Sequence, residues 1–491
     1  MSAAAIGISG LAVYVPRYRV KLEHWCTWYA DSWEKTSTVV GASFRLRGPD
    51  ENVYTMAATA VVRLIEANRI DPSRIGMLAL GTESSTDNSA GAVIVKGMVN
   101  DWLIARGRAP LSRQCEVPEF KHACLGGFYA MKAAARYLAT DGRNRQAIVI
   151  CADSAEYERG TSGEPTQGAG AVAVLMETNP LLLEIDLNRS GGTSDYRGPD
   201  FRKPFARLIR RGLKPNNQPK DFPVFNGKYS TTCYVDEVLL AAADLFSKID
   251  ESPAAYIDAL QAVFLHRPYQ RMAETGLSMI YLLALARSGD ARRRELEGLA
   301  IAAGVDIDAF VEEITAAPDV FQLVRDGNLS SELRPLSAEM ARVFRKTAAY
   351  ERNIGEKLKL GAADMRHVGN LYTASLHAWL AAGFEDALRS GTDIGGTTML
   401  AIGYGSGDAA EAMPMRVAAR WREAAQRIDF QAVLAGAIDL DRAAYEQLHD
   451  VGSVHLEHDA RPRAAFVIDR TGAGNCGFDD IDIDYYRYAE R

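Results

Sequence analysis

Cys124 is the residue of this chain best placed for covalent chemistry, because it lies where a short turn enters a helix. The segment reads Glu119-Phe-Lys-His-Ala-Cys124-Leu-Gly-Gly127. Backbone amides at a helix N-terminus stabilise an anion, so we expect a lowered pKa for the thiol and a raised thiolate fraction. The two glycines would let a substrate approach the backbone closely. A single cysteine among apolar residues is also often an inert small hydrophobe, so the residues alone leave both roles open.

Polar or glycine-rich segments follow four short apolar runs that are typical of buried strands. These pairs are Gly76–Thr82 before Glu83, Ala147–Ala152 before Asp153, Ala262–Leu265 before His266, and Met399–Tyr404 before Gly405-Ser406-Gly407. In sheets with helical crossovers, ligands bind at the carboxyl ends of strands, so the pattern favours an active site. Each residue also has an ordinary role. Glu83 could be a solvated carboxylate, His266 a hydrogen-bonded core histidine, and the glycines a turn.

The elements that would position these residues alternate between strand and helix. Ala-rich, helix-favouring stretches such as Phe128–Ala139 lie between the apolar runs, which predicts an α/β fold. Residues 121–153 run from a turn through a small-residue helix to a strand, and residues 367–407 repeat that order. The similarity concerns order and composition, and it predicts two related halves without a linker.

Three segments are predicted to lie outside this repeated core. Residues 195–228 contain several Pro, Gly and basic residues and predict a loop. Residues 285–350 alternate charged and small apolar residues with helical spacing, which predicts solvent-facing helices without a role in the chemistry. From Met415 onward, an Arg-rich helical pattern and short β-like runs predict surface packing.

Composition and charge exclude several classes of protein. The 491 residues are 47% hydrophobic and 24% charged, so a large core can form, and the net charge of −7 argues against nucleic-acid binding. The six cysteines show neither a Cys-x-x-Cys pair nor metal-ligand spacing, which favours a reducing compartment. The N-terminus shows no basic leader, and no apolar run is long enough to cross a bilayer. We therefore expect a soluble cytoplasmic protein that binds no nucleic acid and no membrane.

Six motifs, in order along the chain, resemble those of 3-hydroxy-3-methylglutaryl-CoA synthases, members of the thiolase-like superfamily. They are Gly81-Thr-Glu83, Ala123-Cys124-Leu-Gly-Gly127, Gly163-Glu-Pro-Thr-Gln-Gly-Ala-Gly-Ala-Val172, Phe264-Leu-His266-Arg-Pro-Tyr269, Val368-Gly-Asn370-Leu-Tyr-Thr-Ala-Ser375 and Tyr404-Gly-Ser406-Gly407. The resemblance implies a duplicated thiolase-like α/β fold with layered helices and mixed sheets (αβαβα) and helical insertions in the C-terminal half. Its halves would be residues 1–180 and 181–491.

The resemblance also implies a reaction, the condensation of acetyl-CoA with acetoacetyl-CoA in the mevalonate route to isoprenoids. Cys124 would carry the acetyl group, and Glu83 would remove a proton from its methyl. His266 would polarise the acetoacetyl carbonyl with Asn370 beside it, and the amides of Cys124 and Ser406 would form the oxyanion hole. Further pocket residues implied by the resemblance are Asp153, Tyr157, Asp200, Phe201, Tyr372, Ser375, Gly405 and Gly407. Arg271 and Lys203 would bind CoA, no metal or cofactor is expected beyond the acyl-CoA substrates, and the chain would form a homodimer.

Departures from the family pattern keep other functions open. Leu125 replaces the usual tyrosine, Arg271 replaces a common lysine, and the basic stretch Arg207–Arg211 is unusual. The first alternative is a family branch that uses β-keto chains bound to an acyl carrier protein in polyketide β-branching. A non-catalytic scaffold and a decarboxylating ketoacyl synthase are further alternatives. Retention of Cys124, Glu83 and His266 argues against the scaffold, and the ketoacyl synthase does not require Glu83.

Overall fold

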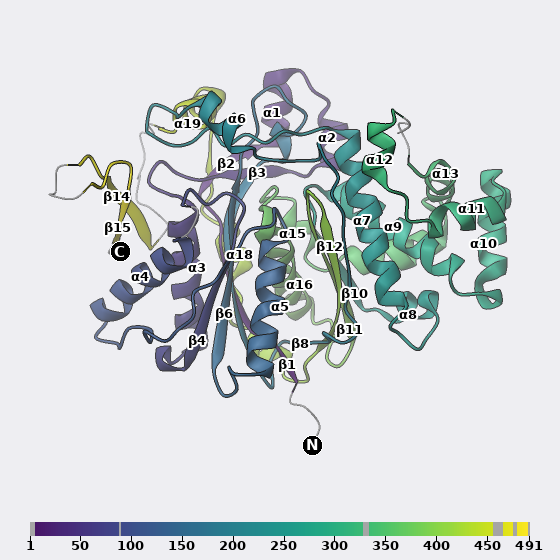
Figure 1. The fold of residues 1–491 in the computed structure, drawn as a ribbon, viewed down its shortest axis with the longest axis horizontal. Coiled ribbons are helices and arrows are strands. Elements are labelled where there is room, and N and C mark those ends of the chain that lie inside the picture. The colour runs from purple at the N-terminus through teal and green to yellow at the C-terminus, as the bar shows by residue number, and fades with distance from the viewer. Residues whose placement is uncertain (1–4, 88–89, 328–332, 455–464, 475–478, 490–491) are drawn as a thin grey trace.

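The computed structural model describes residues 5–87, 90–327, 333–454, 465–474 and 479–489 (Figure 1). The strands are β1 Ile6–Tyr14, β2 Tyr18–Lys21, β3 Ser43–Leu46, β4 Ile75–Gly81, β5 Glu119–Phe120, β6 Gln146–Ala155, β7 Gly168–Thr178, β8 Leu183–Ile185, β9 Gly191–Ser194, β10 Ala262–Leu265, β11 Thr398–Gly405, β12 Ala409–Val417, β13 Ile438–Asp439, β14 Phe466–Thr471 and β15 Asp484–Tyr488. The helices are α1 Leu22–Tyr29, α2 Trp33–Val39, α3 Val53–Asn68, α4 Gly91–Ala105, α5 Gly126–Ala139, α6 Phe205–Arg211, α7 Lys228–Phe246, α8 Pro253–Ala259, α9 Gln270–Ala286, α10 Asp290–Ala303, α11 Ile307–Thr315, α12 Val320–Arg325, α13 Pro335–Phe344, α14 Ala348–Tyr350, α15 Ala362–Met365, α16 Ser375–Ser390, α17 Trp421–Ala425, α18 Phe430–Leu434 and α19 Arg442–Val451.

One ten-stranded mixed sheet runs through the molecule in the order β10-β11-β12-β8-β1-β7-β6-β4-β5, with β9 paired to β12. Strand β4 is parallel to β6, which is antiparallel to β7. The C-terminal half repeats this arrangement, since β10 is parallel to β11 and β11 is antiparallel to β12. The antiparallel pair β1–β8 joins the two halves.

The strands are buried on both faces because helices cover both sides of the sheet. In β6, Ala147, Val149 and Cys151 belong to one apolar core and Ile148 and Ile150 to a second core on the opposite face. Alternate residues of a strand point to opposite faces, so an all-apolar strand fits this double cover.

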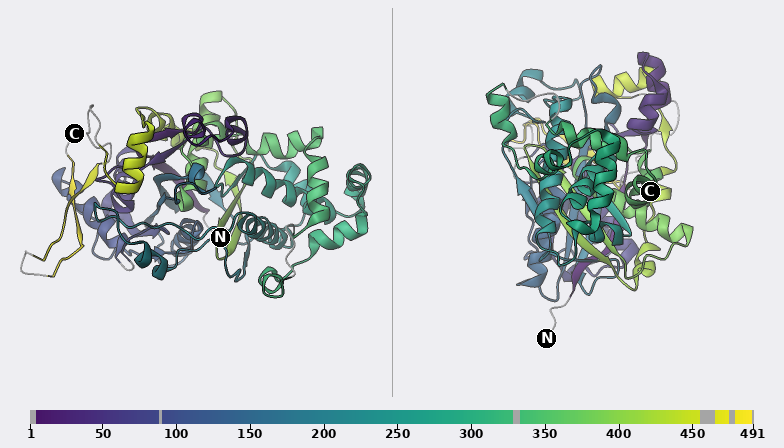
Figure 2. Two further views of the ribbon diagram at one scale, coloured as in Figure 1. Left: turned by 90° about the horizontal axis from the view of Figure 1, so that it is seen from above. Right: turned by 90° about the vertical axis from the view of Figure 1, so that its right-hand side faces the viewer.

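The helices form layers, seen from left to right in Figure 1 and from two further directions in Figure 2. Helices α3 and α4 cover the N-terminal strands, α5 and α16 lie in the middle, α7 covers the C-terminal strands, and α9 packs against α7. Helices α10 to α13 extend beyond α9 on the side away from the sheet.

The α/β class, the four apolar runs and the added helices of residues 285–350 are confirmed. The turn–helix–strand order of residues 121–153 recurs in 367–407 as α5–β6 and α16–β11. Residues 195–228 are mostly irregular, as predicted, but contain α6. The division at residue 180 lies between β7 and β8 and stays a prediction. Within the described residues, each helix is too short or too polar to span a bilayer.

Candidate active site

Cys124 lies in a tight turn between β5 and α5. The preceding residue, Ala123, has φ +40°, in the left-handed region that costs an L-residue about 1–2 kcal/mol. Such strain persists where the surroundings fix the backbone, and it is concentrated at functional sites. The Cys124 thiol donates a hydrogen bond to Glu83, with 3.4 Å between Sγ and Oε2. The end of β4 and the turn before α5 therefore bring together the two residues that the sequence proposed as base and nucleophile.

The end of β11 also approaches the turn that contains Cys124, because Gly405 has no side chain. A Cβ added at Gly405 would lie 2.6 Å from the carbonyl oxygen of His122 and 2.7 Å from Cβ of Leu125. Only glycine allows β11 to pass this close to the nucleophile turn. Ser406, the next residue, lines the same cavity as Cys124.

The cavity brings together just under half of the fifteen predicted site residues. Its wall includes seven of them, namely Cys124, Tyr157, Phe201, His266, Asn370, Tyr372 and Ser406. Tyr157, Phe201 and Tyr372 pack edge to face, with ring centroids 5.8 to 6.4 Å apart. These rings give the nucleophile an apolar, water-poor surrounding, in which charge interactions are strengthened.

Glu83 is a carboxylate whose titration lies near neutrality. Its side chain is 6% exposed, and burial raises its pKa to about 7, with Lys203 acting in the opposite direction. Asp153 holds the backbone around it, because one carboxylate oxygen accepts from the amides of Glu83 at 2.8 Å and Ser84 at 2.9 Å. A base with this pKa is partly ionised at neutral pH and much stronger than an ordinary glutamate.

The predicted lowering of the Cys124 pKa is wrong. Burial, and then the carboxylates of Glu83 and Asp153, raise the pKa of the thiol well above its ordinary value. The helix N-terminus is outweighed because the nearest charged groups are negative. The resting thiol therefore keeps its proton, and Glu83 is the hydrogen-bond acceptor placed to take it when the sulfur attacks.

His266 enters the cavity as a neutral imidazole. Burial lowers its pKa to about 3, and its ring lies against Tyr404 at 6.3 Å between centroids. Asn370 uses its carbonyl oxygen to accept from the Tyr372 amide at 2.9 Å and from Ser375 Oγ at 3.1 Å. Its NH₂ group is left to donate. The site thus offers two neutral donors for a carbonyl.

The other predicted site residues lie behind or beside the cavity wall. Asp153 and Ser375 are fully buried and fix backbone amides, and Asp200 accepts from the Tyr404 hydroxyl at 3.1 Å. Gly407 follows Ser406 in the loop after β11. Arg271 is paired with Glu274 at the start of α9, 3.2 Å away. The roles proposed for these residues in substrate or CoA binding stay predictions.

Two departures from the family pattern now have a place in the structure. Leu125 is fully buried, and its side chain approaches Gly403 and Gly405 of β11 and does not line the cavity. Arg211 forms two hydrogen bonds with Glu158, at 2.8 and 2.9 Å. The remainder of α6 has no buried residue.

One buried group of residues has the spacing of metal ligands. Ligand atoms of Asp200, Cys233 and Asp408 lie within 4.8 Å of one another. Burial and the neighbouring Asp200 carboxylate raise the pKa of Asp408 to about 9.

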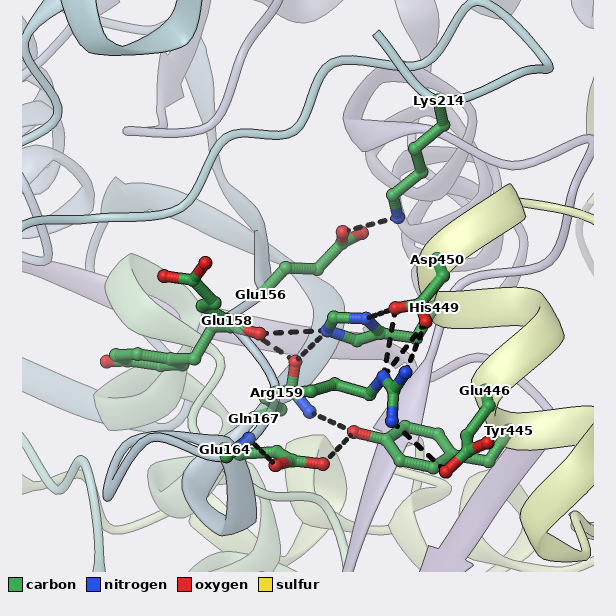
Figure 3. Close-up of polar contacts among 12 residues, drawn as sticks. Glu156, Glu158, Arg159, Glu164, Gln167, Lys214, Tyr445, Glu446, His449 and Asp450 are labelled. Atoms are coloured by element: carbon green, nitrogen blue, oxygen red, sulfur yellow. Dashed lines mark hydrogen bonds and ion pairs between the residues drawn. The ribbon is translucent and has the colours of Figure 1, made fainter. Parts of the chain in front are cut away.

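The sequence interpretation missed the contribution of α19, whose polar side chains contact Arg159, Glu164 and Gln167 (Figure 3). His449 Nε2 donates to the carbonyl of Tyr157 at 2.8 Å, while Gln167 Oε1 accepts from the Tyr157 amide at 3.0 Å. Tyr445 donates to Glu164 at 2.7 Å, and Asp450 pairs with Arg159 at 2.5 Å. Both backbone groups of a cavity residue are thus held by side chains from outside the cavity. The only signal in the sequence was the i, i+4 spacing of Tyr445 and His449.

We expect His449→Phe to weaken this contact and destabilise the protein. Phenylalanine can keep the stacking on Phe222, at 5.5 Å between centroids, but it cannot donate to Tyr157. A buried carbonyl left without a donor costs about 1–3 kcal/mol, so the urea midpoint and the activity should both fall. Arg442→Ala on the same helix is the control, because Arg442 is exposed and solvent screens its ion pair with Glu446. Equal midpoints for His449→Phe and wild type would contradict this assignment.

Over most of its length, the chain is similar in sequence and structure to known proteins of one kind. Residues 3–180 match the sequence model described as hydroxymethylglutaryl-coenzyme A synthase N terminal. The hydroxymethylglutaryl-CoA synthase of Haloferax volcanii is 28% identical over 431 residues, which cover 87% of this chain and 87% of the relative. Synthase A of Dictyostelium discoideum is 25% identical over 445 residues, covering 89% and 80%. The solved structure of MvaS in complex with 3-hydroxy-3-methylglutaryl coenzyme A is 26% identical, with a TM-score of 0.76 over 99% of this chain and 100% of that one.

Proposed function

Because the chain belongs to the hydroxymethylglutaryl-CoA synthase family and has its thiolase-like fold, we propose that it condenses acetyl-CoA with acetoacetyl-CoA to 3-hydroxy-3-methylglutaryl-CoA. The single observation that carries the proposal is the contact of Cys124 with Glu83 at 3.4 Å, beside the cavity that His266 also lines. These groups suit a nucleophile, a base and a carbonyl-binding donor.

The first step transfers the acetyl group to the enzyme. Glu83 accepts the thiol proton as Cys124 Sγ attacks the thioester, a bond forms between sulfur and the acetyl carbon, and the bond from that carbon to the CoA sulfur breaks. Glu83 passes the proton to the leaving CoA, which departs as its thiol and leaves Glu83 ionised for the second step. The amides of Cys124 and Ser406 are the proposed donors to the oxyanion, and removal of one such donor typically costs about 2.7–4 kcal/mol.

The second step forms the carbon–carbon bond. Glu83 removes a proton from the methyl group of acetyl-Cys124, and the resulting carbanion attacks the ketone of acetoacetyl-CoA. His266 and Asn370 are neutral donors that polarise this ketone, in keeping with the pKa of about 3 for His266. Water then hydrolyses the thioester to Cys124, which frees the thiol and releases the product.

Acetyl transfer can be tested directly by mass spectrometry. Incubation with acetyl-CoA is expected to add about 42 Da to the peptide that contains Cys124, because the acetyl group replaces the thiol hydrogen. Subsequent addition of acetoacetyl-CoA should remove the label and yield product. A Cys124 peptide of unchanged mass throughout would overturn the proposal and favour a scaffold.

The second candidate function has the same chemistry, but its acceptor is a β-keto chain bound to an acyl carrier protein instead of to CoA. Helix α6 favours it, because Phe205 and Ile209 are 67% and 64% exposed beside Arg207 and Arg210. An apolar and basic helix suits an acidic protein partner. Comparing acetoacetyl-CoA with an acetoacetyl carrier protein as acceptors separates the candidates, and we expect higher kcat/KM with acetoacetyl-CoA.

The proposal also covers the cofactors, pathway, cellular compartment and oligomeric state of the enzyme. It needs no cofactor besides the two substrates and would serve the mevalonate pathway. The five described cysteines are free thiols, which supports a reducing compartment such as the cytoplasm. Homodimer formation is proposed from membership of the superfamily.

A further inference from the structure

Lys203 reaches the catalytic carboxylate from the irregular segment before α6. Its ammonium lies 3.4 Å from Glu83 Oε1 and 2.9 Å from Asp221 Oδ2. It also lies over the Tyr372 ring, 4.9 Å from the centroid. Only 13% of the side chain is exposed. The sequence suggested CoA binding for this residue, but its ammonium faces two carboxylates and an aromatic ring at the centre of the site.

We propose that Lys203, held in place by Asp221, is a positioning residue that sets the charge state of the catalytic base Glu83. The inference rests on the proposed function, since it assigns Glu83 the role of base. It adds a cation and a counter-carboxylate to the catalytic group.

The charges around Glu83 explain why such a residue is needed. Asp153 and Asp221 disfavour a negative charge on Glu83, and burial acts in the same direction, whereas the hydrogen bond from the Cys124 thiol favours that charge. The hydroxyls of Tyr157 and Tyr372 also lie close enough to interact with the Glu83 charge. Lys203 is the one cation acting on Glu83 among these neighbours, and its charge, more than the hydrogen bond from Cys124, brings the pKa of Glu83 down toward neutrality.

Lys203 itself stays charged over the working pH range. Burial acts to lower its pKa, but Asp221 and Glu83 outweigh burial and raise the pKa above its ordinary value. Glu83 consequently titrates beside a constant positive charge. An opposite charge at this distance lowers a carboxyl pKa by about 1–3 units.

The experiment compares the pH dependence of kcat/KM in Lys203→Met, Lys203→Arg and wild type. Activity requires ionised Glu83, so it rises as pH increases through the pKa of that group. Without the cation, this rise should move about 1–3 pH units upward, with kcat/KM at pH 7 lower by about fivefold or more and recovery only above the raised pKa. We call the rising part of the pH profile its limb. Lys203→Arg should keep the limb at the wild-type pH, because arginine keeps the positive charge.

Asp221→Asn provides a variant with the opposite expected sign. The Asp221 carboxylate raises the pKa of Glu83, so its removal should move the limb to lower pH. Lys121→Met is the matched control, since this exposed lysine contacts Ser85 at 2.9 Å and is not among the groups acting on Glu83. An unchanged limb in Lys203→Met would overturn the inference. A rise in the KM for acetyl-CoA at every pH, with the limb in place, would assign Lys203 to CoA instead.

A measurement without turnover keeps this test separate from the proposed function. Iodoacetamide alkylation of Cys124, followed by mass spectrometry, reports the protonation of the thiol–carboxylate pair. Its rise with pH should move upward in Lys203→Met and stay in place in Lys121→Met. Identical alkylation profiles for Lys203→Met and wild type would refute the charge effect. Loss of acetylation in wild type would refute the proposed function alone.

Discussion

Replacement of Cys124 by alanine is expected to abolish both the acetyl-enzyme and product formation. Without sulfur at this position, the acetyl group has no acceptor, and the carbanion that attacks acetoacetyl-CoA cannot form on the enzyme. Loss of the nucleophile in a covalent mechanism costs roughly 10⁶-fold in kcat. Product formation from the two CoA esters, measured by chromatography, and the mass of the intact protein after acetyl-CoA treatment check both expectations.

Cys115→Ala is the matched control for this substitution. Cys115 is a buried free thiol that packs in the apolar core formed with α3 and α4. Its replacement removes a thiol of the same chemistry from a site outside the catalytic cavity, so acetylation and turnover should persist. Acetylation of Cys124→Ala at the wild-type level would mean that another residue is the nucleophile.

The identity of the principal residues could be predicted from sequence because each belongs to a short local pattern. Cys124 precedes a glycine-led helix, and Glu83 and His266 each follow a strand of apolar residues. Strand ends of an α/β sheet meet at one edge, so local patterns were enough to place these side chains near one another. The Ala-rich helices and apolar runs likewise determined the fold class.

The charge states could not be predicted, because they depend on contacts between distant segments. The prediction for Cys124 considered only its own helix, whereas the pKa of its thiol is raised by burial and by carboxylates of two other strands. Lys203 belongs to an irregular segment, in which no periodicity indicates where a side chain points. The bond from His449 to Tyr157 joins residues 292 positions apart.

Replacement of Glu83 by glutamine should separate the two halves of the reaction. Glutamine keeps the shape of the side chain but cannot accept a proton from the acetyl methyl group. General base catalysis contributes about 10²–10⁴-fold, so condensation should fall by that factor. The Glu83 charge raises the pKa of the Cys124 thiol, and its removal makes the thiolate easier to form. Acetyl-enzyme should therefore still accumulate, although more slowly than in wild type, because water must take the thiol proton in place of Glu83.

Three measurements on Glu83→Gln test this prediction. Mass spectrometry should show the acetyl group on Cys124, while deuterium from solvent should fail to enter its methyl group and product formation should be slow. Glu119→Gln is the control, because this carboxylate accepts from Ser85 at 3.1 Å on the strand beside the nucleophile turn, and its loss should leave condensation near wild type. Normal deuterium exchange and condensation in Glu83→Gln would remove Glu83 from the role of base. Loss of acetylation together with condensation would instead show that Glu83 is required for the attack of the thiol, despite the lower pKa that the substitution gives to Cys124.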